Sequence, residues 1–166
     1  MVKLALYIKA DLQGVTDLQP ASDDFEWAFK VVCNSCHEEH PKFVTVNRLD
    51  SRELSTGHDT ANFVWKCSFC KRESSAKFDQ LPDKSSLKPY QVAQDRGQDF
   101  APIVALDCRG LEFVGFDLRG TWKCVGAESG TAFPEVEFED GEWTDYDEKT
   151  KEDVGISAVE TKWQRM

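Results

Sequence analysis

The chain opens with apolar residues at every second position. From residue 4 to residue 12 the even positions are apolar, while Lys3, Lys9 and Asp11 occupy odd positions. A period of two places alternate side chains on opposite faces of a β-strand. We therefore expect a first strand with one face toward a core and the other toward solvent.

The same period of two returns in both halves of the chain. It predicts further strands over residues 25–33, 63–67, 104–108, 135–139 and 154–163, and the segment 43–49 is a further predicted strand. Residues 50–62 are polar, which predicts a loop. Between residues 111 and 118 the apolar phase shifts around Gly115, which predicts a β-bulge. The sequence therefore predicts an all-β protein.

A polar segment separates the two groups of strands. Residues 79–102 contain three prolines and at most one or two helical turns near Tyr90–Gln94. A connection this long usually crosses a face of the molecule or spans between subdomains. We therefore divide the chain into a β-unit at 1–78, a linker or crossover at 79–102 and a second β-unit at 103–166.

Each half begins with an apolar strand that is followed by turns and further strands. Leu12–Val15 follows the first of these strands, and Leu111–Val114 follows its counterpart. This echo between the halves indicates a duplication. We expect two similar, closely joined antiparallel β-sandwich or barrel-like units, packed as one globule, of which the N-terminal unit carries the metal.

Two Cys-x-x-Cys pairs stand at the ends of two predicted strands. Cys33 and Cys36 form the first pair, Cys67 and Cys70 form the second, and 30 residues lie between the pairs. A two-residue gap lets both thiolates of a pair turn toward one point. Two such corners supply four soft ligands, which zinc binds at the corners of a tetrahedron in closed structural sites. The pairs therefore predict one Zn²⁺ per chain.

Other chemistries of paired cysteines fit the sequence less well. The stretch Cys33–His37 matches the Cys-x-x-Cys-His pattern of c-type haem attachment, but haem would leave the second pair unexplained. A thioredoxin-like redox pair needs a helix N-terminus to lower a thiol pKa, and the residues after Cys36 have no helical apolar stripe. Disulfides require an exported protein. Transfer of a soft ion such as copper(I) through exposed thiolates remains an alternative.

The charge of the chain restricts its partners. The chain has 166 residues, enough to bury a core, with a net charge of −10 and a pI of about 4.8. A phosphate backbone requires clustered Lys and Arg, so we expect no nucleic-acid partner. The N-terminal apolar run Leu4–Ile8 is too short for a signal peptide, and no run is long enough to span a membrane. We expect a cytoplasmic protein without a membrane partner, and the nucleus is a second compatible location.

Three histidines and two further cysteines have both a chemical and a structural interpretation. Four cysteines complete a tetrahedron, so we expect His37, His40 and His58 to be exposed rather than to bind the ion. If His37 contributes, we expect it to tune a ligand sulfur from outside. Cys108 falls on the apolar face of a strand, where a free cysteine behaves as a small hydrophobe. Cys124 follows in a less regular stretch, and we expect it to be more exposed.

The segment from Glu135 to Asp153 is rich in acidic residues. We expect a solvated acidic face; the alternative is a patch that attracts a basic protein partner. Within it, we expect Trp143 and Tyr146 to pack across strands rather than to anchor a partner. Asp145 and Asp147 have no nucleophile motif or glycine-rich phosphate loop beside them. We therefore expect no enzyme activity.

Several motifs together are similar to those of a known family. The stretches that resemble the eukaryotic CXXC-motif-containing zinc-binding proteins are Cys33-Asn-Ser-Cys36, Cys67-Ser-Phe-Cys70, Glu128-Ser-Gly-Thr131, Trp143-Thr-Asp-Tyr-Asp-Glu-Lys149 and Val154-Gly-Ile156. The resemblance covers essentially the whole chain. It implies a compact all-β protein of two similar β-units with one zinc ion, whose four ligands map onto Cys33, Cys36, Cys67 and Cys70. It brings no established catalytic activity.

These observations lead to one hypothesis and one alternative. The hypothesis is a zinc-binding protein whose structural four-cysteine site supports a non-catalytic, monomeric module for binding other proteins. The alternative is a protein that handles a soft metal (zinc or copper) or performs thiol-redox chemistry through its Cys-x-x-Cys pairs. The hypothesis predicts one tightly held ion, whereas the alternative predicts an exchangeable ion or cysteines that react in the folded state.

Overall fold

The computed structural model describes residues 2–91 and 99–166, which form β-strands and connecting loops without a helix. The strands are β1 (Val2–Gln13), β2 (Val15–Pro20), β3 (Trp27–Cys33), β4 (Val44–Val46), β5 (Arg52–Glu53), β6 (Thr60–Ala61), β7 (Phe63–Lys66), β8 (Glu73–Asp79), β9 (Ala101–Arg109), β10 (Leu111–Asp117), β11 (Trp122–Gly126), β12 (Ala132–Val136), β13 (Trp143–Asp147) and β14 (Glu152–Arg165). In this part of the chain, no helix is long and apolar enough to cross a membrane.

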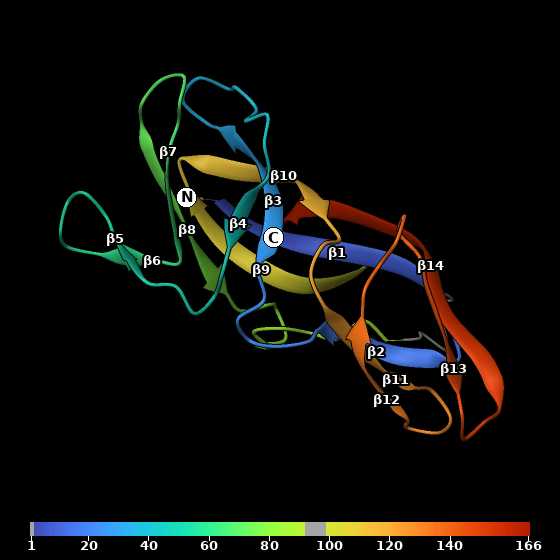
Figure 1. Cartoon of the computed structure of the whole chain (residues 1–166). Coiled ribbons are helices and arrows are strands. Elements are labelled where there is room, and N and C mark those ends of the chain that lie inside the picture. Colours follow the sequence, from blue (N-terminus) through green and yellow to red (C-terminus); the bar gives the residue numbers. More distant parts are fainter. Residues whose placement is uncertain (1, 92–98) are drawn as a thin grey trace.

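The largest sheet is antiparallel and combines both ends of the chain. Its strand order is β13-β14-β1-β9-β8-β7 (Figure 1). β1 lies between β14 and β9, and its pairing with β14 extends from Leu4 opposite Arg165 to Gln13 opposite Gly155. Strands from 1–78 and from 103–166 are thus interleaved in one sheet. The boundary between two units stays a prediction, but β1 joins both groups of strands.

Smaller antiparallel sheets complete the fold. The sheets β10-β3-β4 and β12-β11-β2 share a hydrophobic core with the large sheet, and β5 and β6 form a separate hairpin. Together the sheets form a half-barrel. The predicted all-β, antiparallel fold class is confirmed.

The predicted apolar faces form the core. In β1 the even residues from Leu4 to Leu12 are all buried. Aromatic rings fill the centre: Phe29 of β3 lies 4.8 Å from Phe113 of β10 and 4.7 Å from Trp163 of β14, between ring centroids. Burial of such large apolar rings is a main source of folding free energy.

The structure confirms the predicted bulge and changes the bounds of several predicted strands and loops. The bulge at Gly115 is confirmed by a register shift between β10 and β3. The strand predicted over 43–49 is the three-residue β4. The predicted loop at 50–62 contains β5 and β6, which are too short to show a period of two. The strand predicted over 135–139 is displaced, because β12 ends at Val136.

Tyr90 anchors the predicted crossover between the two groups of strands. Its backbone forms a bridge with Leu18 of β2, and its buried hydroxyl donates a hydrogen bond to the carbonyl of Asp99 over 2.8 Å. Burial raises the pKa of the Tyr90 hydroxyl, which therefore stays a donor. The helical turn predicted near Tyr90–Gln94 falls mostly on residues 92–98, outside the described residues.

The acidic segment is exposed except at one carboxylate. Asp147 is 1% exposed, so it does not belong to the solvated face that the sequence predicts. Trp143 packs edge-on against Phe133, with ring centroids 5.5 Å apart, as expected. Tyr146 is 48% exposed and lies opposite Asp153 of β14, so its packing across strands stays a prediction.

The Asp147 carboxylate joins the β11–β12 turn to the β13–β14 turn. It accepts hydrogen bonds from Ser129 Oγ (2.5 Å), Thr131 Oγ1 (3.0 Å) and the backbone N–H of Lys149 (3.0 Å). The bond from Ser129 contributes most to a lowered pKa of Asp147. Two of the motifs noted above, at 128–131 and 143–149, therefore meet at this carboxylate.

Replacing Asp147 by Asn tests this contact. Because the folded state lowers the pKa of Asp147, its carboxylate stabilises the fold above about pH 4, the ordinary Asp pKa. That stabilisation disappears as the pH falls through the lower folded-state pKa. We expect Asp147→Asn to lower the urea unfolding midpoint at pH 7, and its difference from the parent protein to shrink below about pH 4.

Asp145→Asn is the matched control, because Asp145 lies on the same strand but is exposed. It should change the midpoint little at either pH. The stabilising role of the Asp147 carboxylate would be contradicted if both variants lowered the urea midpoint equally. It would also be contradicted if the effect of Asp147→Asn did not depend on pH.

Candidate metal centre

Two chain corners meet at one end of the half-barrel. The first follows β3, which ends at Cys33, and the second follows β7, which ends one residue before Cys67. β3 belongs to the sheet β10-β3-β4, whereas β7 is the edge of the six-stranded sheet. In Figure 1 the two loops, one blue and one green, lie side by side at the upper left. The site therefore joins strands of two different sheets.

Both corners have the same backbone hydrogen bonds. In the first, the N–H of Cys33 donates to the carbonyl of Glu38 (3.1 Å), and the N–H of His37 donates to the carbonyl of Cys33 (2.8 Å). The equivalent bonds from and to Cys67 are 3.0 and 2.9 Å long. His37 and Lys71, four residues after each first cysteine, both have left-handed backbones with φ of 61° and 66°. Two copies of one tight turn thus present the two sulfur pairs.

The four sulfur atoms are close enough to bind one ion. All four Sγ atoms lie within 4.8 Å of one another, and the Cys33–Cys70 and Cys36–Cys67 pairs are 3.6 and 3.7 Å apart. A tetrahedral site with Zn–S bonds of about 2.3 Å has sulfurs about 3.8 Å apart. A disulfide would need about 2.05 Å. The number, type and spacing of the donors therefore fit Zn²⁺.

The packed sulfurs favour a bound cation. Burial acts to raise the pKa of Cys33, but hydrogen bonds led by the N–H of Cys36 bring it down to about 7. At Cys36 the N–H of Glu38 acts to lower the pKa, yet burial and the neighbouring sulfurs raise it to about 12. The sulfurs therefore resist simultaneous deprotonation among themselves. A bound metal ion favours the deprotonated form of all its ligands.

In each corner the first cysteine is more deeply buried than the second, and the two corners also touch outside the sulfurs. Cys33 and Cys67 are fully buried, whereas Cys36 and Cys70 are partly exposed. The guanidinium of Arg72 donates a hydrogen bond to Ser35 Oγ over 3.2 Å and links one corner to the other. Sequence reasoning missed Arg72, because no local pattern relates two residues on separate corners.

The three histidines lie outside the sulfur cluster. His37 and His58 are exposed. His40 Nδ1 lies 3.3 Å from the carbonyl of Lys42, and its ring packs edge-on against Trp65 with centroids 5.7 Å apart. Among the described residues, the cluster suited to a metal ion consists of the four cysteines.

Cys108 and Cys124 are both buried in the core. Burial raises the pKa of each thiol to about 12, assisted by Asp107 near Cys108 and by Asp145 near Cys124. The burial expected for Cys108 is confirmed. The greater exposure expected for Cys124 is wrong, because this residue lies in β11 opposite Phe133, on the inner face of a sheet.

An antiparallel half-barrel with four cysteines gathered between two of its sheets defines the chain as a zinc-binding β-protein. The chain belongs to the family of eukaryotic CXXC motif containing zinc binding proteins, whose family model matches residues 5–164.

Named relatives and a solved structure agree with this family. The chain is 41% identical over 159 residues to the human CXXC motif containing zinc binding protein, with 96% of each chain covered. It is 41% identical over 165 residues to the Xenopus laevis protein of that name, with 99% of each covered. The crystal structure of C1orf123 superimposes with a TM-score of 0.87 at 38% identity and covers 99% of both chains. The fold described here is thus the fold of a solved homologue.

Removing single sulfurs tests the ligand set. We expect Cys33→Ser, Cys36→Ser, Cys67→Ser and Cys70→Ser each to purify with clearly less than one zinc per chain, because three thiolates leave the tetrahedron open. Metal content is measured by plasma mass spectrometry. Cys124→Ala is the matched control and should keep its zinc, since Cys124 lies in the core outside the cluster. Full zinc in any of the four serine variants would remove that cysteine from the ligand set.

Proposed function

We propose that the protein is a non-catalytic module for binding other proteins, in which Cys33, Cys36, Cys67 and Cys70 hold one structural zinc ion. The observation that carries this proposal is the origin of the sulfurs on two different sheets. An ion at this point links segments that share no strand pairing. Zinc binding stabilises finger peptides by roughly 10–16 kcal/mol, which is comparable with the whole stability of a domain, about 5–15 kcal/mol.

The donor set also supports a structural rather than a catalytic ion. Catalytic zinc keeps a coordination position open for water or substrate, whereas four thiolates close the tetrahedron. A closed tetrahedron supports a binding role without turnover.

The state of the cysteines supports a reducing compartment. None of the six cysteines forms a disulfide, and the two core thiols are not paired with each other. Such thiols persist in cytoplasm and nucleus, where reductants oppose disulfides. We place the protein in the cytoplasm as a monomer, with a protein as its partner.

Transfer of a soft ion is a second candidate function. The partial exposure of Cys36 and Cys70 favours it, because a partner's thiol can approach one sulfur of each pair. The duplicated corners and their hydrogen bonds favour retention of the ion instead, since they fix both buried sulfurs in place.

Thiol alkylation under native mass spectrometry separates the two functions. We expect the folded protein to retain one zinc and to react at none of its six cysteines with iodoacetamide. Chelation should expose the four ligands, whereas Cys108 and Cys124 should react only after unfolding, because burial holds their pKa at about 12 and the thiolate is the nucleophile. Labelling of Cys36 and Cys70 in the metal-loaded protein, or rapid replacement of zinc by added copper(I), would support ion transfer.

Hydrogen exchange tests whether the ion is structural. We expect chelation to accelerate amide exchange at residues 33–40 and 63–72, because the ion holds the β3 and β7 corners together. Residues 122–126 and 143–157 are the internal control and should change much less, since β11, β13 and β14 are paired by backbone hydrogen bonds away from the corners. Unchanged exchange at both corners in metal-free protein would contradict a structural role.

A further inference from the structure

The sheet edges β12 and β13 lie close together without a backbone hydrogen bond between them. β12 is the outer strand of β12-β11-β2, and β13 is the outer strand of the six-stranded sheet. A groove lies between them, with Phe133 and Pro134 of β12 on one wall and Asp145 and Tyr146 of β13 on the other. The contact of Phe133 with Trp143 closes the groove toward the core. In Figure 1 this region lies at the lower right, away from the two metal-binding corners.

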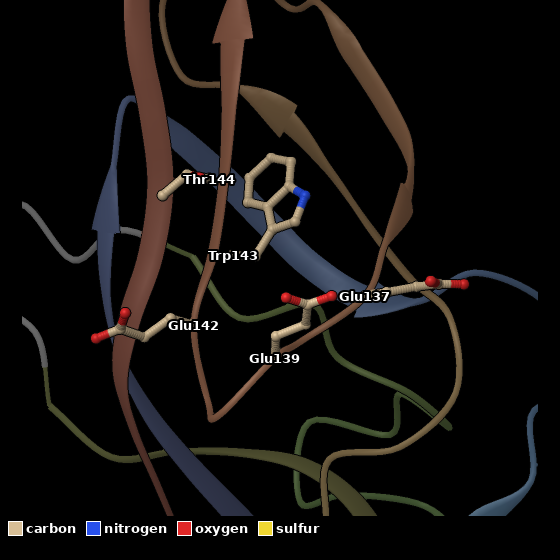
Figure 2. Close-up of a pocket in the computed structure, with 5 residues that line it drawn as sticks. All are labelled: Glu137, Glu139, Glu142, Trp143 and Thr144. Carbon is tan, nitrogen blue, oxygen red and sulfur yellow. The ribbon is translucent and has the colours of Figure 1, made fainter.

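A second hollow adjoins the groove along β13. It is lined by Trp143 and Thr144 of β13 and by glutamates of the connection that precedes it. Figure 2 shows the indole of Trp143 projecting from β13 toward the neighbouring strand, with Glu137 and Glu139 on the connecting chain beside it. The two hollows therefore follow one another along the same strand edge.

The negative charge of the protein is concentrated here. Residues 132–153 carry ten acidic and two basic side chains, a net charge of −8 out of −10 for the whole chain. The acidic residues that line the two hollows are Glu135, Glu137, Glu139, Glu142, Asp145 and Glu148. None of these six forms an ion pair with another described residue, whereas seven acidic residues elsewhere pair with Lys or Arg. Lys149 is the one basic residue that lines these two hollows, so their surface stays strongly negative.

The carboxylates are spread along the groove rather than gathered at a point. Among the described residues, the four cysteines are the group whose ligand atoms converge closely enough to hold a metal ion. A distributed row of negative charge fits an extended cation better than a single ion. The same charge repels nucleic acids and anionic lipid surfaces.

We propose, building on the interaction function proposed above, that the β12–β13 groove binds an extended, arginine-rich segment of a partner protein. Guanidinium groups pair with Glu135, Asp145 and Glu148, because a planar fork matches a carboxylate in two hydrogen bonds. The exposed ring of Tyr146 offers a face on which one guanidinium stacks. Arginine is therefore favoured over lysine.

The two strand edges differ in their capacity to pair with this segment. β13 is paired with β14 on one side only, so its other edge can accept a partner strand. The N–H of Tyr146 donates to Asp145 Oδ1 over 2.7 Å, and a partner strand that bonded this N–H would displace that contact. Pro134 has no N–H, which weakens the facing edge of β12 as a pairing surface. The partner segment therefore extends the six-stranded sheet beyond β13.

Fluorescence anisotropy with the full-length, zinc-loaded protein tests this proposal. The probe is a fluorescein-labelled peptide of alternating Arg and Thr, and the comparison peptides carry Lys or Glu in place of Arg. The groove variant is Glu135→Gln with Asp145→Asn and Glu148→Gln. Its matched control, Asp23→Asn with Glu39→Gln and Glu53→Gln, removes the same charge from exposed positions elsewhere.

We expect the parent and the control to bind the Arg peptide, and the groove variant to bind at least about tenfold more weakly. Tyr146→Ala should weaken the Arg peptide more than the Lys peptide. Four results would overturn the proposal: no binding by the parent, equal weakening of both triple variants, unchanged binding by the groove variant, or displacement of the peptide by low concentrations of calcium, which would indicate a cation site only.

Zinc content and thermal unfolding, measured on the same samples, separate this proposal from the proposed function. Zinc that leaves without any change in unfolding overturns the structural role and leaves a groove result standing. If zinc is retained and the groove variant binds the peptide as well as its control does, only the proposal of peptide binding in the groove is overturned.

Discussion

In the proposed function, attraction between one cation and four sulfurs holds together the end of the half-barrel that carries the cysteines. Strand pairing stops at this end: β3 and β7 lie in different sheets, and their loops contact through Arg72 and Ser35 but share no ladder. Four thiolates at these separations would repel one another, so full deprotonation of the cluster is favourable only with positive charge at its centre. The proposed ion thus takes the place that a strand pair takes elsewhere in the fold.

The opposite end is closed by different means. There the outer strands β12 and β13 also share no backbone ladder. The Asp147 carboxylate at the end of β13 accepts hydrogen bonds from Ser129 and Thr131, which lie in the turn before β12. Phe133 and Trp143 cover the core beneath. These contacts leave the strand edges themselves free. The proposed metal thus joins the strands at one end, whereas hydrogen bonds between turns join them at the other.

The features that the sequence predicts are those that depend on neighbouring residues. Alternation in β1 and β3 depends on residues two apart, and each Cys-x-x-Cys corner on four consecutive residues. The pairing of β1 with β14 joins residues more than 140 positions apart, and alternation does not specify a partner. The burial of Asp147 was not predicted for the same reason, because it depends on hydroxyl groups from another turn. The burial of Cys124 depends on the strand opposite, which the local sequence does not specify.

The distribution of charge connects the fold to a binding role. Outside residues 132–153 the chain is nearly neutral, with a net charge of −2. A net charge of −8 within 22 residues raises the free energy of the folded protein, because the carboxylates repel one another. Within the described part of the chain, the carboxylates that line the groove form no ion pairs that would reduce this repulsion. Asp147 shows that a carboxylate in this segment can be satisfied internally when hydroxyls are placed beside it. Its exposed acidic neighbours receive no hydroxyl hydrogen bond in the described structure, and they border two outer strands, β12 and β13. A positively charged partner would lower this repulsion on binding, so the same carboxylates that weaken the free protein strengthen a complex with an arginine-rich strand.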